Sequence, residues 1–195
     1  SGTGITGNLF KFGDEGSGNL GKSVFIAGDV NGDGYSDVII GKNSTIDAVY
    51  RGVVEVYHGY DIDSDNLTSL EITQAPDWSA DLSASIIVDG FGDAVSTAGD
   101  VNGDGYADVI IGAKSYLVSG DFVGAAFLYQ GSSTGLGNNN SWMIEGNQNN
   151  GLFGTSVGIA GDVNGDGYSD VIVGESSFNN NGKAYIYYGT IEGII

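Results

Sequence analysis

The sequence contains no cysteine, one proline (Pro76) and one histidine (His58) among its 195 residues. The absence of cysteine excludes disulfides and thiolate metal sites. A single histidine cannot supply more than one Ser-His-Asp triad. His58 also occupies a slot that the other repeats fill with Gln130 and Tyr188, so we expect it at the surface and predict no catalytic residues.

Basic residues and long apolar runs are scarce as well. Six Lys and Arg stand against 25 Asp and Glu, which gives a formal net charge of −19. Such a charge repels nucleic acid and anionic membrane surfaces. The aliphatic runs, such as residues 38–40, are far shorter than the roughly 18 apolar residues that a membrane-spanning helix needs. We therefore expect no nucleic-acid partner and no membrane insertion.

Glycine, by contrast, is abundant, with 35 copies in a chain rich in Val, Ile and Tyr. β-Branched and aromatic residues favour strands, and frequent glycine marks tight turns between them. No stretch shows a sustained helical period. The composition predicts an all-β protein.

One acidic nonapeptide occurs three times in nearly the same form, at Asp29–Asp37, Asp100–Asp108 and Asp162–Asp170. Positions 1, 3, 5 and 9 are Asp, Asn, Asp and Asp, and positions 4 and 6 are Gly. Alternate side chains on a tightly curled backbone converge on one point, and Ca²⁺ binds six to eight oxygens in flexible geometry. An EF-hand is excluded, because position 12 is Ile or Val rather than Glu and the flanking segments are strand-like.

The pattern predicts one Ca²⁺ per loop, hence three per chain, which would also offset part of the acidic charge. The main-chain carbonyl of Tyr at position 7 would complete each site, while its ring packs locally. We expect each ion to pin a turn between two strands rather than to perform chemistry. The predicted ligands are Asp29, Asn31, Asp33, Tyr35, Asp37, Asp100, Asn102, Asp104, Tyr106, Asp108, Asp162, Asn164, Asp166, Tyr168 and Asp170.

The loops belong to a longer repeat, because similar strand-like segments flank each copy. One strand ends in Ala-Gly before the loop, a Val-Ile strand follows it, then comes a Tyr-rich strand and a weaker segment that contains Trp78 or Trp142. Four strands per unit of this length indicate a β-propeller blade. We expect a single domain, 1–195, with approximate units 14–78, 79–142 and 143–195 plus 1–13.

The two ends of the chain are offset by one strand. Residues 9–13 align with Trp142–Gly146 of a fourth strand, and the sequence stops after a third strand. An N-terminal fourth strand would latch a blade and remove a sheet edge, but three blades cannot close a ring of roughly four to eight. Either two chains form a six-bladed ring or the sequence is an excerpt of a longer one. We favour a homodimer formed by strand exchange.

The chain resembles the FG-GAP repeats of the integrin α-subunit propeller and of bacterial surface proteins. The resemblance rests on Phe-Gly at Phe91 and Phe153, on the acidic loops, and on the Gly-x-x-Tyr-x-Tyr-x-Gly pattern at Gly182–Gly189. It implies four-stranded blades with Ca²⁺ bound between the first and second strands. Leu20 replaces Phe in the first unit, and Gly-Ala-Pro is missing after the second strands, so the strand 2–3 turns are expected to differ.

Three functions fit this sequence. The favoured one is a calcium-stiffened binding or adhesion module, extracellular or at the cell surface, that presents its strand 2–3 and 4–1 turns to a protein or glycan. Alternatives are a structural spacer of a larger extracellular protein and a polysaccharide-acting propeller enzyme; no asymmetric cluster of acids or bases supports the last. The variable turns are Lys42–Arg51, Ala113–Val123 and Glu175–Asn181, with Arg51, Tyr116 and Phe122 as expected contacts.

Overall fold

The computed structural model describes residues 18–46, 49–60, 75–82 and 90–195, and of residues 18, 43–46 and 49–51 it describes the backbone alone. Within these ranges the chain forms β-strands and one 3₁₀ turn, Phe178–Asn180, and no α-helix. The prediction of an all-β protein is confirmed. No helix in the described part of the chain is long and apolar enough to cross a membrane.

Three antiparallel sheets follow one another along the chain, each with its strands in sequence order. The first sheet contains β1 (Gly18–Gly28), β2 (Asp37–Ile46), β3 (Val49–Tyr57) and β4 (Trp78–Asp81). The second contains β5 (Phe91–Gly99), β6 (Asp108–Ala113), β9 (Ala125–Tyr129) and β10 (Trp142–Glu145). The third contains β11 (Phe153–Gly161), β12 (Asp170–Glu175) and β13 (Lys183–Tyr187). Two hairpins complete the described strands: β7 (Leu117–Val118) with β8 (Asp121–Phe122), and β14 (Gly189–Thr190) with β15 (Gly193–Ile194).

The sheets repeat one register. Ile39 pairs with Val56 in the first sheet, Ile110 with Leu128 in the second, and Ile172 with Ile186 in the third. The fourth strands of the first two sheets begin at the two predicted tryptophans, so the predicted unit limits at 78 and 142 fall on their first residues. The predicted N-terminal fourth strand, residues 9–12, lies outside the described residues.

Every first strand carries two β-bulges, and each explains a short motif of the sequence. In β5 the register shifts between Phe91 and Ala94 and again between Thr97 and Gly99. Gly92 and Gly99 adopt φ of 77° and 75°, a left-handed region that side chains disfavour. Bulges bend and twist a strand, so the glycines of Phe-Gly and Ala-Gly shape the strand that leads into each acidic loop.

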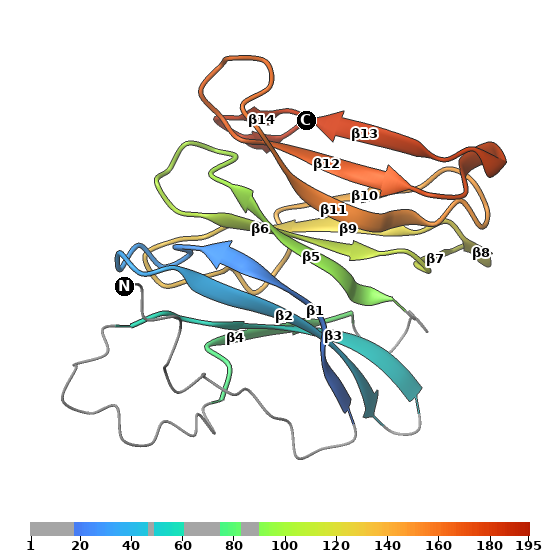
Figure 1. The fold of residues 1–195 in the computed structure, drawn as a ribbon, viewed down its shortest axis with the longest axis horizontal. Helices are drawn as coiled ribbons and strands as arrows, with labels where there is room; N and C mark the ends of the chain where they lie inside the picture. Colours follow the sequence, from blue (N-terminus) through green and yellow to red (C-terminus); the bar gives the residue numbers. More distant parts are fainter. Residues whose placement is uncertain (1–17, 47–48, 61–74, 83–89) are drawn as a thin grey trace, which may run out of the picture.

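The three sheets stack face to face, and β5 lies against both β1 and β11 (Figure 1). Side chains of adjacent sheets form the two cores between them. The Tyr129 ring meets Trp78 of the first sheet edge-on, with centroids 4.9 Å apart, and Tyr187 meets Trp142 of the second in the same way at 5.1 Å. These two aromatic pairs occupy equivalent positions and pack each sheet against the next.

Antiparallel sheets stacked in this manner are consistent with a propeller-like domain. Among the described residues the sheets do not close on one another, and the third sheet has three strands. The number of blades, the N-terminal latch and the two-chain ring therefore stay predictions.

Candidate functional site

The acidic loops join the first strand of each sheet to the second. All three lie on the same side of the stack, where the first strands end (Figure 1). We call this side the acidic end, and the side where the second strands end the opposite end. Backbone hydrogen bonds tie each loop to the next: Ala107 N–H donates to the carbonyl of Asp29 at 2.9 Å, and Ser169 N–H donates to that of Asp100 at 3.0 Å. The predicted site residues of the three units thus form one end of the molecule rather than three scattered turns.

The position-1 carboxylate organises the curl of each loop. In the first loop Asp29 Oδ1 accepts hydrogen bonds from the N–H groups of Gly32 at 2.7 Å and Asp33 at 3.1 Å. Asp29 Oδ2 accepts one from Gly34 N–H at 2.9 Å. Gly32 and Gly34 have φ of 75° and 91°, so the glycines at positions 4 and 6 permit the curl that the sequence predicted.

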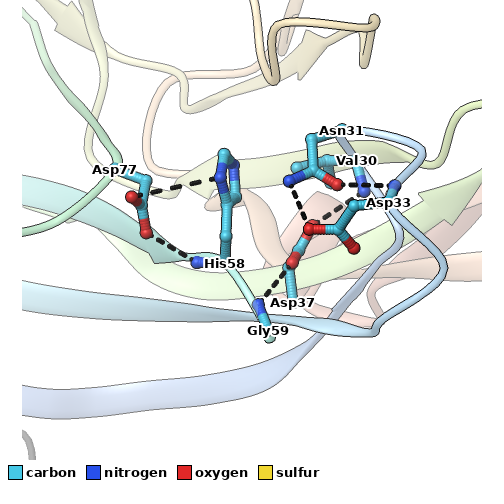
Figure 2. Close-up of polar contacts among 7 residues, drawn as sticks. All are labelled: Val30, Asn31, Asp33, Asp37, His58, Gly59 and Asp77. Atoms are coloured by element: carbon cyan, nitrogen blue, oxygen red, sulfur yellow. Dashed lines mark hydrogen bonds and ion pairs between the residues drawn. The ribbon is translucent and has the colours of Figure 1, made fainter. Parts of the chain in front are cut away.

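Positions 3 and 5 are bound to each other (Figure 2). Asn31 Nδ2 donates to Asp33 Oδ2 at 2.8 Å, and Asn31 Oδ1 accepts from Asp33 N–H at 3.0 Å. Asp33 Oδ1 also accepts from Tyr35 N–H at 2.9 Å, and this bond is the largest cause that lowers the pKa of Asp33. Asp33 is exposed and Asn31 is partly exposed, so solvent or a cation can reach both side chains.

The same set of hydrogen bonds recurs in the other two loops. The second loop repeats them from Asp100, Asn102 and Asp104, and the third repeats them from Asp162, Asn164 and Asp166. Because one sequence produces one conformation three times, whatever a single loop binds the others are built to bind as well.

The aspartate at position 9 has a second role that the sequence did not reveal. Asp37 is buried, and its carboxylate accepts from Val30 N–H at 2.8 Å and from Gly59 N–H at 2.8 Å (Figure 2). It therefore joins the start of the loop to the end of the third strand. Asp108 and Asp170 make the equivalent pairs. The glycine that closes every third strand was the available signal, since it recurs in all three units.

Electrostatics show that the carboxylates of one loop affect one another. Burial raises the pKa of Asp108 to about 7, against the lowering effect of the Gly131 and Val101 N–H groups and with a further rise from nearby Asp104 and Asp100. Burial thus disfavours an ionised carboxylate at this position, and the neighbouring acids of the same loop add a smaller repulsion. A cation would relieve that repulsion.

The donor set fits a hard cation such as Ca²⁺. A carboxylate has about four acceptor sites; Asp29 uses three on backbone N–H groups, while Asp33 and Asp37 each use two. Each side chain therefore retains capacity for a metal. In the described ranges, however, no three carboxylate or histidine side chains lie close enough together to hold an ion as they stand. Binding requires the loop side chains to turn toward a common point.

The prediction that the position-7 rings pack locally is wrong for two of the three tyrosines. A Cβ added to Gly32 would lie 2.6 Å from the Tyr106 ring, and one added to Gly103 would lie 2.8 Å from the Tyr168 ring. Each ring therefore packs on the position-4 glycine of the preceding loop, in the neighbouring sheet. That glycine serves the contact between sheets as well as the curl.

His58 is less exposed than the sequence suggested. Its N–H donates to Asp77 Oδ2 at 2.7 Å, its Nδ1 lies 4.0 Å from Asp77 Oδ1, and its Nε2 is buried without a hydrogen-bond partner (Figure 2). Packing beside the second sheet, close to Gly135, explains the burial. In the described part of the chain no serine hydroxyl is hydrogen-bonded to His58 Nε2.

At the opposite end the strand 2–3 turns of the three sheets differ. The second sheet has the β7–β8 hairpin there, and the third has the 3₁₀ turn Phe178–Asn180. Phe122 is exposed, as expected for a contact residue, whereas the Tyr116 ring packs on Phe127 with centroids 5.6 Å apart. The Arg51 side chain lies outside the described part of the structure.

Comparison with known proteins agrees with this architecture. The FG-GAP repeat family matches residues 91–129 and 153–187, which are the first three strands of the second and third sheets. Integrin alpha-4 of Xenopus laevis is 31% identical over 169 residues, covering 85% of this chain and 15% of that protein. Integrin alpha-7 of Mus musculus is 32% identical over 115 residues, covering 58% and 10%.

A relative of another kind is phosphatidylinositol-glycan-specific phospholipase D of Mus musculus, 34% identical over 110 residues that cover 51% of this chain and 13% of that protein. The chain spans no more than 15% of the length of these three relatives. Residues 91–129 and 153–187 are FG-GAP repeats, and the chain is an integrin-like FG-GAP domain.

Proposed function

We propose that this domain is a calcium-binding, non-catalytic module of an extracellular or cell-surface adhesion protein. The observation that carries the proposal is the identical hydrogen-bond set of the three acidic loops, each with oxygen donors at positions 1, 3, 5 and 9. Asp, Asn and a main-chain carbonyl are the ligands that Ca²⁺ prefers, whereas Mg²⁺ demands stricter octahedral geometry. The similarity to integrin alpha subunits supports an adhesion role and this location.

Calcium would act on the scaffold. The position-9 aspartate already joins the loop to the end of the third strand, so an ion at positions 1 to 9 would lock the strand 1–2 turn to that strand. It would also offset the repulsion from Asp104 and Asp100, which adds to the effect of burial in raising the pKa of Asp108. A ligand that binds only the folded chain stabilises it by mass action.

The non-catalytic reading follows from the side chains at hand. The chain has one histidine and no cysteine, and the Nε2 atom of that histidine is buried without a hydrogen-bond partner. The match to the phospholipase covers 13% of that protein, so its activity is not carried over to this chain. The recurring acids lie in structural positions of the repeat rather than in one asymmetric cluster.

The opposite end offers the binding surface. Asn149 Nδ2 donates to Asp121 Oδ1 at 2.6 Å, which ties the β7–β8 hairpin to the strand 4–1 turn. Gln148 Oε1 accepts from Asn179 N–H at 3.1 Å, which ties that turn to the third sheet. The three turns thus form one continuous surface, rich in amide groups, with Phe122 exposed on it. Such a surface suits a glycan or a polar protein loop.

Thermal unfolding with and without calcium tests the proposal. We expect saturating Ca²⁺ to raise Tm by at least several degrees over the same sample in EGTA, and Mg²⁺ to raise it less. The triple variant Asp33→Ala, Asp104→Ala, Asp166→Ala changes exposed side chains and should abolish the difference. Equal Tm values in calcium and EGTA would refute calcium binding.

Ligand binding is tested separately on glycan and extracellular-protein arrays. We expect a bound ligand to be lost with Phe122→Ser and retained with Tyr188→Ser, an exposed aromatic outside the three turns. A calcium-stabilised domain that binds nothing on either array would favour a spacer role instead.

A further inference from the structure

Positions 7 and 8 of one acidic loop lie against positions 1 and 4 of the loop before it. The Tyr106 ring of the second loop packs on Gly32 of the first, where an added Cβ would lie 2.6 Å from the ring. Ala107 N–H donates to the Asp29 carbonyl at 2.9 Å. The third loop makes the same two contacts with the second. Neighbouring loops are therefore in direct contact through a fixed pair of residues.

This pair is also held by its own loop. Tyr106 N–H donates to Asp104 Oδ1 at 3.0 Å, and the main-chain carbonyl of Tyr106 is the predicted position-7 ligand. Ala107 is followed directly by Asp108, whose buried carboxylate is the predicted position-9 ligand. Tyr106 and Ala107 thus connect the predicted ligands of one loop to the backbone of the loop before it.

Calcium binding would change the setting of this pair. In the described ranges no three carboxylate or histidine groups lie close enough to hold an ion as they stand, so the loop side chains must turn. When Asp104 turns, its bonds to Asn102 Nδ2 and to Tyr106 N–H change with it. An ion in the second loop would therefore reset and fix Tyr106, and with it the contacts on Gly32 and Asp29 of the first loop.

Direct repulsion between neighbouring ions acts in the opposite sense, but it is weak. Packed sheets lie about 10 Å apart, whereas the Debye length at 0.15 M ionic strength is about 8 Å. A bound ion would therefore lower the affinity of the next loop only slightly. A loop that its neighbour has already ordered loses less conformational entropy when it binds, and this raises its affinity. The sign of the cooperativity shows which of the two effects is larger.

We propose that the acidic loops bind calcium with positive cooperativity, and that the position-7 tyrosine and the residue after it transmit binding from each loop to its neighbour. The inference rests on the calcium binding proposed above and adds how one site regulates the next. Because a coupling free energy is reciprocal, binding in either loop raises the affinity of the other. The second sheet lies between the first and the third (Figure 1), so the second loop links the other two.

Two variants that each keep two loops intact test the coupling. Asp166→Ala keeps the neighbouring first and second loops, whereas Asp104→Ala keeps the first and third, which are identical in sequence and separated by the second sheet. In calorimetric titration at 0.15 M salt, the second ion should bind Asp166→Ala at least about fivefold more tightly than the first. The two ions should bind Asp104→Ala with equal intrinsic affinities.

The possible outcomes separate this inference from the proposed function. Two ions per chain without cooperativity in Asp166→Ala, or with the same cooperativity in both variants, would overturn the coupling and leave calcium binding intact. If neither variant binds calcium, the proposed function and the coupling both fail.

The route through the tyrosine has its own test. Tyr106→Leu, made in the Asp166→Ala chain, removes the ring from Gly32 but keeps the main-chain carbonyl, so the fivefold difference should fall to about twofold or less. Tyr188→Leu is the matched control, because Tyr188 is an exposed tyrosine outside the loops, and it should keep the difference. Circular dichroism checks that both variants fold. Full cooperativity in Tyr106→Leu, or an equal loss in the control, would overturn the role of the tyrosine.

Discussion

The two ends of the sheet stack differ in how far the three units agree. At the acidic end one nonapeptide adopts one hydrogen-bond pattern three times, and each loop is bonded to the next by a backbone hydrogen bond. At the opposite end the second sheet has a hairpin where the third sheet has a 3₁₀ turn. Uniform chemistry at one end and varied chemistry at the other are what we expect if the first end is scaffold and the second is the proposed recognition surface.

The two ends also differ in the side chains that hold them together. Asp37, Asp108 and Asp170 are buried and fix main-chain groups of two strands. The turns at the other end are joined by exposed amide side chains such as Asn149. Substitutions at the acidic end should therefore lower the stability of the fold, whereas substitutions at the opposite end should alter only ligand binding.

The largest effect is expected from Asp108→Ala. It leaves the Val101 and Gly131 N–H groups buried without an acceptor, so the free energy of unfolding in EGTA should fall by about 3 kcal/mol. Urea denaturation measures the change. Asp121→Ala, which removes an exposed acceptor in the β7–β8 hairpin, is the control and should change stability by about 0.5 kcal/mol or less. Equal losses would erase the distinction between the two ends.

A smaller effect should follow from Gly103→Ala. Both Gly103 and Gly105 have positive φ, 72° and 91°, so alanine is strained at either. Only at Gly103 would the new Cβ strike the Tyr168 ring, since nothing lies within 4 Å of Gly105. We expect Gly103→Ala to lower the unfolding free energy by about 1–3 kcal/mol more than Gly105→Ala. Matching values would show that the ring contact between sheets contributes nothing.

The smallest effect on stability is expected from Phe122→Ser. Phe122 is exposed on β8, so the unfolding free energy should stay within about 0.5 kcal/mol of the wild type. If it is a contact residue, its ligand should bind at least about tenfold more weakly. A large loss of stability would place Phe122 in the scaffold and remove it from the recognition surface.

The strands and loops were predictable because their signals are local. Alternating β-branched residues and recurrent glycines define the strands, and the first strand, loop, second strand and third strand of every unit lie where the sequence placed them. The Trp78 and Trp142 segments were also correctly assigned to fourth strands.

Contacts between distant segments were not predictable from one sequence. The bond from Gly59 to Asp37 spans 22 residues, and the Tyr106 ring reaches a glycine of another sheet. The burial of His58 depends on the second sheet, which packs beside it close to Gly135. The recurrent glycine after each third strand was a signal only for the first of these contacts. Tyr106 and His58 do not depart from their local patterns, so the sequence does not identify their partners until the stacking is known.

Counting the calcium ions bound per chain tests the central claim most directly. Calorimetric titration of chelator-treated protein should give three Ca²⁺ per chain, and two after Asp104→Ala, which removes an exposed donor of one loop. If the titration shows no binding of calcium, or if the variant binds the same number of ions as the wild type, the assignment of calcium to the acidic loops is contradicted.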